Sequence, residues 1–232
     1  MKLYKYRPIN EYVEPILTSN KIWFPKRKTL NDPEDLLIEI ENDITVETYR
    51  EFLINKSLEA QRPKKFLRAN FKQAFDRNGL THAAKRKINL ALKKMQANFD
   101  RLGILSLSEN ADDEILWDEY AEKKKGVCLE FELPHSEYLL KVLYVETRPK
   151  LKLSELLFDN DSEKMLIEVL RTKTMKWSHE NEWRYFIKQG NVEFSFMGSI
   201  TGIRFGIMTE LKNKQKIITL IDSCESKIKI YG

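Results

Sequence analysis

The order of apolar and polar positions predicts a chain that opens with strands. LYKYR (Leu3–Arg7) alternates and is rich in aromatic residues, which favours a short strand that Pro8 ends. Residues 10–19 suit a short helix, and KIWF (Lys21–Phe24) suits a second strand. A turn is expected at Asn31-Asp32-Pro33, where the side chains of Asn31 and Asp32 offer oxygen acceptors.

The pattern then becomes helical for more than fifty residues. We predict helices over 45–60, 63–78 and 81–101, the last with an apolar seam at Ile88, Leu92 and Met95. Strand-like sequence stops before this stretch and resumes at Gly103, so residues 45–101 are expected to form a basic helical insertion, or lobe, in a β-rich body. The predicted fold is α+β, with residues 1–232 forming a single domain.

Strands and helices alternate again after Gly103. A strand over ILSLS (Ile104–Ser108) is followed by a helix that Asn110 is expected to cap and that Gly126 is expected to end in a left-handed conformation. A strand is predicted over Val127–Leu133, another over 140–145 and a helix over 162–172. The last third reads as a run of short strands, namely EWRYFIK, NVEFSF, ITGIRFG, KIITLI and KIKIY.

Composition narrows the class of protein. The 42% hydrophobic content supports a sizeable core, and no apolar run approaches the roughly 20 residues that cross a bilayer. The chain starts with a polar-aromatic segment, and its two cysteines lack the clustering of a zinc site. A cytoplasmic protein without a membrane partner is therefore expected.

Positive charge is concentrated in one segment. Between Gln61 and Arg101 there are 12 Lys or Arg residues against Asp76 and Asp100, within a chain whose net charge is +5. Such a segment is either a solvated helical surface or a contact for nucleic acid or an acidic protein. Residues 61–101 are thus the candidate partner-binding region.

The densest group of polar and aromatic residues lies between Trp177 and Arg184. If the chain is extended here, a two-residue period puts Glu180, Glu182 and Arg184 on one face of a strand. Paired carboxylates are useful where positive charge develops at a sugar carbon, since one stabilises the charge while the other orients a hydroxyl. The alternative is a solvated ladder of charges over a core that contains Trp183 and Tyr185.

Six sequence elements occur in an order that resembles the bacterial domain-of-unknown-function 2971 family. They are LYKYR, KIWF with LNDPED, GILSLSE, LWDEYA with KKGVCLEF, KWSHENEWR, and ITGIRFG. The resemblance spans nearly the whole chain except the basic insertion. It implies a cytoplasmic bacterial or prophage protein, with a role in phage defence, abortive infection or toxin-like activity.

A more remote similarity, to mono-ADP-ribosyltransferases, implies a reaction. That family uses an Arg on a strand, a Ser-x-Ser strand and a later Glu-x-Glu, and Arg7, Ser106-Leu107-Ser108 and Glu180-Asn181-Glu182 follow the same order. The similarity implies an ADP-ribosyltransferase-like core with NAD as substrate and no metal. Arg7 would bind the pyrophosphate, Ser106 or Ser108 would brace the site, and Glu182 would hold the ribose. Glu180 would orient the acceptor.

Tyr120 and Arg184 are further candidates for nucleotide binding. Tyr120 and Trp117 share one helix face and either stack on a base or belong to the core. Arg7 in turn either contacts phosphate or pairs with an acid of the Asn31–Asp35 turn.

Two other classes of protein stay open. One is a non-catalytic regulatory module whose basic helices bind nucleic acid or a protein. The other is a nuclease in which Asp32, Asp35 and the acidic stretch Glu109–Glu122 coordinate Mg²⁺. His179 is expected to be a hydrogen-bonding neighbour of the Glu180 region rather than a general base.

Overall fold

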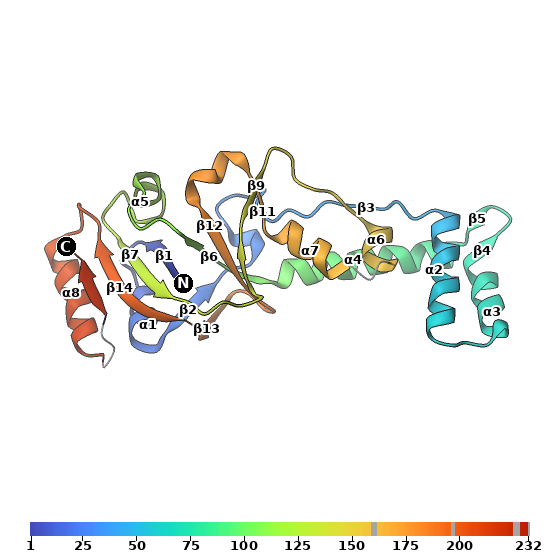
Figure 1. Cartoon of the computed structure of the whole chain (residues 1–232), viewed down its shortest axis with the longest axis horizontal. Helices are drawn as coiled ribbons and strands as arrows, with labels where there is room; N and C mark the ends of the chain where they lie inside the picture. Colours follow the sequence, from blue (N-terminus) through green and yellow to red (C-terminus); the bar gives the residue numbers. More distant parts are fainter. Residues whose placement is uncertain (159–161, 196–197, 225–227, 232) are drawn as a thin grey trace. The chain divides into compact units, whose positions relative to one another are not determined.

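The computed structural model describes residues 1–158, 162–195, 198–224 and 228–231. Helices and strands alternate along these residues in an α+β arrangement, which confirms the predicted class (Figure 1). In chain order the elements are β1 (Lys2–Arg7), α1 (Val13–Ser19), β2 (Lys21–Phe24), the 3-10 helix η1 (Arg27–Thr29), β3 (Ile40–Glu41), α2 (Val46–Glu59), α3 (Lys64–Ala74), β4 (Phe75–Asp76), β5 (Gly79–Leu80), α4 (His82–Arg101), β6 (Gly103–Ser108), α5 (Glu114–Tyr120), β7 (Val127–Glu132), β8 (Leu139–Lys141), β9 (Leu143–Val145), β10 (Leu151–Lys152), α6 (Leu153–Phe158), α7 (Ser162–Leu170), β11 (Thr172–Thr174), the 3-10 helix η2 (Met175–Glu180), β12 (Glu182–Ile187), β13 (Val192–Ser195), β14 (Ser199–Phe205), α8 (Leu211–Asp222) and β15 (Lys229–Tyr231).

The chain forms two compact units, each built from segments that are separate in sequence. The first contains Met1–Asp35, Arg101–Glu146 and Lys173–Gly232, and the second contains Leu36–Asp100 and Thr147–Thr172. The helices expected in the insertion, α2 to α4, fall in the second unit together with α6 and α7, which we had not grouped with them. The expectation of a single domain stays a prediction.

A seven-stranded mixed sheet is the centre of the first unit. Its order is β15-β14-β7-β1-β6-β12-β8, so the first strand of the chain lies in the middle of the sheet. Neighbouring strands are antiparallel except β14 and β15, which are parallel. Both faces of the sheet are covered at its centre, since β1 buries Leu3 on one face and Tyr6 on the other, and β7 is buried from Val127 to Phe131.

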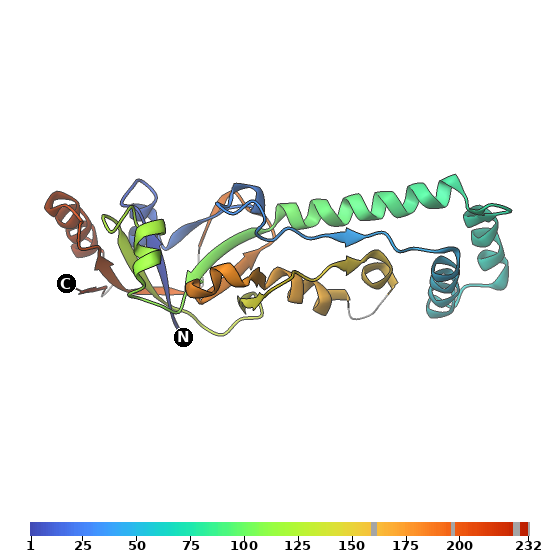
Figure 2. The same ribbon diagram turned by 90° about the horizontal axis from the view of Figure 1, so that it is seen from above.

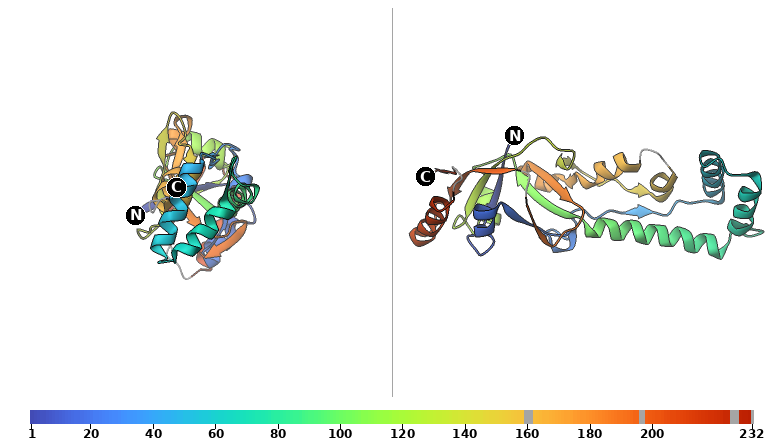
Figure 3. Two further views of the ribbon diagram at one scale, coloured as in Figure 1. Left: turned by 90° about the vertical axis from the view of Figure 1, so that its right-hand side faces the viewer. Right: turned by 90° about the horizontal axis from the view of Figure 1, so that it is seen from below.

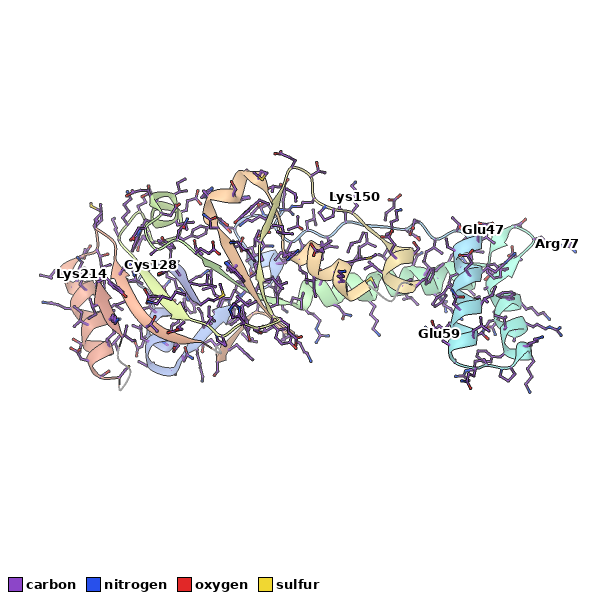
Figure 4. The ribbon with its side chains drawn as sticks, viewed as in Figure 1. Glu47, Glu59, Arg77, Cys128, Lys150 and Lys214 are labelled. Carbon is purple, nitrogen blue, oxygen red and sulfur yellow. The ribbon has the colours of Figure 1, made fainter. Side chains whose placement is uncertain are left out.

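Helices pack on both faces of this sheet. On one face Leu3, Leu129 and Phe131 are fully buried in a cluster that includes apolar residues of α1 and α8. These two helices lie beside one another in the right-hand view of Figure 3. On the other face Tyr6 meets Trp117 of α5 edge to face, with 5.1 Å between ring centroids. Cys128, labelled in Figure 4, is buried in this second cluster.

The second unit is organised around the 20-residue helix α4. Figure 2 shows α4 running alongside the extended segment that contains β3. Ile88 of α4, Tyr49 of α2 and Leu153 of α6 share one apolar core, as the predicted seam requires. The two segments of the unit are joined by the parallel pairing of β3 with β10, and by a hydrogen bond of 2.9 Å from the Ser154 amide to Asp43.

Most predicted elements agree with the structure to within a few residues, and the long helices agree best. The helix expected over 81–101 is α4, and the one expected over 45–60 is α2, with Thr45 as its capping residue. The single strand expected over 140–145 is divided between β8 and β9. Of the strands predicted near the C-terminus, Phe196 and Lys227 lie outside the described residues.

Three local predictions are wrong. KIITLI lies in α8, where Ile217 and Ile221 face the core at helical spacing. The N-cap of α5 is Asp113, whose carboxylate accepts hydrogen bonds from two backbone amides, and it is not Asn110. Gly126 does not have a positive φ. The left-handed residues are Glu122, Lys123 and Lys124, a little earlier in the same turn, with φ between 53° and 65°.

Within the described part of the chain, no helix combines the length and apolar character needed to span a bilayer.

The backbone of β1 passes so close to Gly126 that a larger residue would not fit there. A Cβ at this position would lie 2.1 Å from the carbonyl oxygen of Arg7, the last residue of β1. We expect Gly126→Ala to lower the free energy of unfolding by about 1–3 kcal/mol, the usual cost of overpacking, in urea titrations. The neighbouring exposed change Lys125→Ala should stay within about 0.5 kcal/mol of the parent. Equal losses in the two variants would contradict this role.

Candidate functional site

The pairing between β1 and β6 stops after one residue pair, and a pocket opens where it stops. β1 pairs with β7 along its whole length but with β6 only at Tyr4↔Ser108. The pocket has a volume of about 290 Å³ and lies within the first unit. Its lining comprises Tyr4, Lys5, Tyr6, Arg7, Pro8, Trp23, Pro25, Leu30, Asn31, Asp35, Ile104, Leu105, Ser106, Leu107, Ser108, Leu116, Tyr120, Lys173, Glu180 and Glu182.

Glu180 and Glu182 provide the acidic part of the lining. Glu180 ends η2 and Glu182 begins β12, so the expectation of one continuous strand from Glu180 onward is wrong. Asn181 between them has φ 43°, a left-handed conformation that asparagine tolerates better than most residues. This turn brings both carboxylates to the same pocket, although they do not share a strand face.

Glu182 is held as a carboxylate by two cations. Its side chain is 3% exposed and accepts hydrogen bonds of 3.0 Å from Arg184 Nε and from Lys173 Nζ. Burial alone would raise its pKa, but the charges of Arg184 and Lys173 outweigh burial and lower the pKa to about 2. Glu182 therefore stays ionised at neutral pH.

Glu180 has the opposite electrostatic character. Its Oε1 accepts a hydrogen bond of 2.8 Å from the Tyr120 hydroxyl, and its other oxygen contacts the ammonium of Lys173. Burial raises the pKa of Glu180 and the nearby Glu182 charge adds to the rise, while Lys173 opposes it. Two neighbouring carboxyls whose pKa values are pushed apart are suited to different tasks in one reaction.

Arg184 lies behind the pocket lining and contacts the acidic residues of the site. It is fully buried, and its Nη2 lies 2.8 and 2.9 Å from the two oxygens of Asp35. It does not belong to the pocket lining, so the geometry assigns it to positioning Glu182, whereas we had expected it to contact a nucleotide. The solvated charge ladder is wrong as well, because Glu180, Glu182 and Arg184 are all buried.

Lys5 and Arg7 give the pocket a cationic part. Arg7 is half-buried and makes no ion pair with the Asn31–Asp35 turn, so that alternative is wrong. Burial lowers the pKa of its guanidinium. Lys5 donates a hydrogen bond of 2.8 Å to the carbonyl oxygen of Ser106. Burial, with a contribution from Arg7, lowers the pKa of Lys5 to about 8.

The two serines brace the acidic part through different contacts. Ser108 Oγ donates a hydrogen bond of 2.7 Å to the carbonyl oxygen of Glu180 and accepts one of 3.0 Å from the Asn110 amide. Ser106 lies opposite Arg184 in the β6–β12 pairing, and its side chain helps to lower the pKa of Glu182. Both serines line the pocket.

Tyr120 lies in the pocket and Trp117 in the core. The Tyr120 hydroxyl accepts a hydrogen bond of 3.2 Å from Asn31 and donates to Glu180. Trp117 is 9% exposed and packs against Tyr6, as the core alternative predicted for it.

The structure therefore brings six of the seven candidate residues to one pocket and sets Arg184 behind it. Lys5 and Lys173 are lining residues that the sequence analysis missed, and Asp35 was expected there as a metal ligand or as an acid of the turn that could pair with Arg7. Lys5 stands two residues before Arg7 in the same alternating segment, and this spacing was a signal that the two side chains share a face.

Among the described residues, one group of three has its possible metal-binding atoms within 4.8 Å of one another: Glu119, His179 and Glu180. The group does not include Asp32 or Asp35. Asp35 is bound to Arg184, and Asp32 accepts a hydrogen bond from Trp177. Both oxygens of Glu180 already meet Tyr120 and Lys173, so an ammonium group stands where a metal ion would neutralise this carboxylate. The absence of a metal cofactor stays a prediction.

Comparison with known proteins finds a family model that matches part of the chain. Residues 116–185 match the model of a family described as a protein of unknown function, DUF2971. The matched segment covers less than a third of the chain and contains the acidic part of the site, from Tyr120 to Arg184, but not β1. It supports the resemblance to that family over this segment. No curated protein and no solved structure shows a significant match to the chain.

Opposite pKa shifts in the two carboxyls lead to a prediction about acid stability. The folded pKa of Glu182, about 2, lies below the roughly 4.3 of an unfolded Glu, so its contribution is present above pH 4.3 and is lost as the pH falls toward 2. Glu180, with a raised pKa, works in the opposite direction. We expect Glu182→Gln to flatten the fall of unfolding free energy between pH 6 and 3, on the order of 1–3 kcal/mol, and Glu180→Gln to steepen it.

The measurement is a series of urea titrations at each pH. Glu132→Gln, an exposed change on β7, is the control and should follow the parent. Identical pH dependence in the parent and Glu182→Gln would show that Glu182 is not the group held ionised.

Proposed function

We propose that the pocket binds NAD or a related nucleotide and that the protein cleaves its glycosidic bond, by ADP-ribosyl transfer or by hydrolysis. The carrying observation is the pairing of an ionised Glu182 with a Glu180 of raised pKa, in a pocket that Lys5 and Arg7 also line. The resemblance to the DUF2971 and ADP-ribosyltransferase families further suggests a role in phage defence or as a toxin-like effector in the cytoplasm.

The chemistry requires charge stabilisation at one carbon. As the bond between ribose C1′ and the nicotinamide nitrogen breaks, its electron pair leaves with nicotinamide and positive charge develops on the ribose. A buried carboxylate beside this carbon stabilises the charge, because the low dielectric strengthens the attraction. Glu182, kept ionised by Arg184 and Lys173, has the required state.

Glu180 is suited to the second half of the reaction. A water molecule or an acceptor hydroxyl forms the new bond to C1′ and releases one proton. A carboxylate with a raised pKa accepts a proton more readily near neutral pH than an ordinary one. The Tyr120 hydroxyl and Lys173 fix the orientation of Glu180 for this step.

The size and aromatic content of the pocket fit part of a dinucleotide. A volume of about 290 Å³ lies near the lower end for ligand pockets, so it encloses the reacting half of NAD and leaves the remainder at the open side. Trp23 lines the pocket with 38% of its surface exposed and offers a face on which a base can stack.

The direct test is release of nicotinamide from NAD, followed by mass spectrometry with and without cell lysate and nucleic acid as acceptor sources. We expect Glu182→Gln to lower the rate by at least about 100-fold, since it removes the charge that stabilises the transition state. Glu132→Gln, outside the pocket, should keep the parent rate. Because Glu182 also belongs to the buried charge network, Arg7→Ala is a second variant and should raise KM. Absence of release in every mixture would overturn the proposal.

A second candidate function rests on the second unit. All 12 Lys and Arg residues between Gln61 and Arg101 are exposed, and none pairs with a carboxylate of the described residues. Arg77, at the turn between β4 and β5, extends away from the rest of the unit in Figure 4. An array of exposed cations without carboxylate partners is suited to the phosphates of a nucleic acid, which supports the non-catalytic binding module.

This candidate predicts salt-dependent binding that does not need the pocket. We expect the triple change Lys85→Ala, Arg86→Ala and Lys87→Ala to weaken RNA or DNA binding and to reduce the slope of log affinity against log salt by about 0.9 for each lost phosphate contact. Glu182→Gln should not alter binding. Removing the same charge from α8, with Lys212→Ala, Lys214→Ala and Lys216→Ala, is the matched control in fluorescence anisotropy titrations. If both triple variants bind as the parent does, the candidate fails.

A further inference from the structure

We infer that Lys5 acts with Arg7 as the anion-binding pair of the pocket and that the pair selects ligands with two linked phosphates over ligands with one. The inference deepens the proposed function, on which it rests for the site, and names a residue and a chemical class of ligand.

The first argument is the placement of the two cations. Lys5 and Arg7 are two residues apart on β1, so their side chains leave the same face with Cα atoms about 6.6 Å apart. Both line the pocket at the point where the ladder between β1 and β6 has stopped. With two positive groups at this spacing, each group can contact one phosphate of a diphosphate. A ligand with a single phosphate contacts the pair less fully.

The second argument is the lack of a carboxylate partner. The Lys5 ammonium has three donors, and its one hydrogen bond within the described residues goes to the carbonyl oxygen of Ser106. Arg7 has no hydrogen bond or ion pair with a described side chain. Partial burial of a cation without a counter-ion is costly, and both groups accordingly have lowered pKa values. A bound anion would remove this cost.

The third argument is the contrast with the other two cations of the site. Lys173 contacts Glu180 and Glu182, and Arg184 contacts Asp35 and Glu182, so their charges are compensated inside the protein. Uncompensated positive charge is left at Lys5 and Arg7 alone among the lining residues. The phosphates of a ligand are therefore directed to β1, and the group on which positive charge develops is directed to Glu180 and Glu182.

A purely structural role for Lys5 predicts something different. In that case the ammonium ties β1 to β6 through the Ser106 carbonyl, and Lys5→Met changes the stability of the protein but not its relative affinity for anions. Comparing several anions separates the two roles, because a stability effect alone does not discriminate between one phosphate and two.

The experiment is isothermal titration of the full chain with pyrophosphate, inorganic phosphate and ADP-ribose. The parent should bind pyrophosphate and ADP-ribose at least tenfold more tightly than phosphate, and Lys5→Met should weaken binding of both at least tenfold. Lys21→Met, which removes an exposed lysine of β2 outside the pocket lining, should match the parent. Equal affinity of Lys5→Met and parent for pyrophosphate would overturn the inference.

A second measurement uses the unmodified protein and holds even if Lys5→Met fails to fold. Pyrophosphate should slow acetylation of Lys5 by an amine-reactive reagent, followed by mass spectrometry, and should leave acetylation of Lys21 unchanged. Unchanged modification of Lys5 would again overturn the inference. Binding of ADP-ribose without nicotinamide release would overturn the proposed function and leave this inference standing, whereas nicotinamide release with an unchanged KM for NAD in Lys5→Met would do the reverse.

Discussion

A fully buried guanidinium, that of Arg184, is the constraint on which the site depends. An unpaired charge in this position would be very costly, so the fold surrounds it with carboxylates from distant parts of the sequence. Asp35 comes from the N-terminal region and Glu182 from the same strand, and Lys173 lies against both acids. The requirement to satisfy Arg184 thus fixes the position of Glu182 and keeps it ionised near neutral pH.

The two sides of the site differ in the sign of their excess charge. Two cations, Lys173 and Arg184, face three carboxylates, and the neighbouring Glu182 charge contributes to the raised pKa of Glu180. On β1 the imbalance has the opposite sign, since Lys5 and Arg7 meet no carboxylate. A pocket with one anionic wall and one cationic wall orients a ligand that carries both signs of charge, before any specific contact forms.

The sequence predicted the local helices and strands and most residues of the site well. It predicted less well how deeply side chains are buried and which distant segments pair. Arg7, Ser106, Ser108 and Glu182 were selected by the resemblance of their order along the chain to that of ADP-ribosyltransferases, and all four line the pocket. Alternation indicates a face but not how deeply it is buried, which is why Arg184 was expected at the surface of the pocket. Lys173 lies in a strand of three residues, too short for any period to be visible.

Other differences have equally local causes. KIITLI is apolar enough for either a strand or a helix, and only its packing beside α1 decides for the helix. The left-handed run of Glu122 to Lys124 has no glycine to reveal it. The joining of residues 36–100 with 147–172 depends on contacts such as that between Asp43 and Ser154, which no local pattern encodes.

The central position of β1 also affects how the chain is made. β1 is synthesised before the other strands of its sheet, and its partner β7 begins more than 100 residues later, at Val127. At synthesis rates of about 5–20 residues per second, the first strand waits at least about 5 s without a ladder partner. Helices α2 to α4 are completed during that interval, and the hydrogen bonds within each helix join residues near in sequence, which meet fastest. The strand that carries Lys5 and Arg7 is thus the earliest part of the pocket to be synthesised and among the last to be secured.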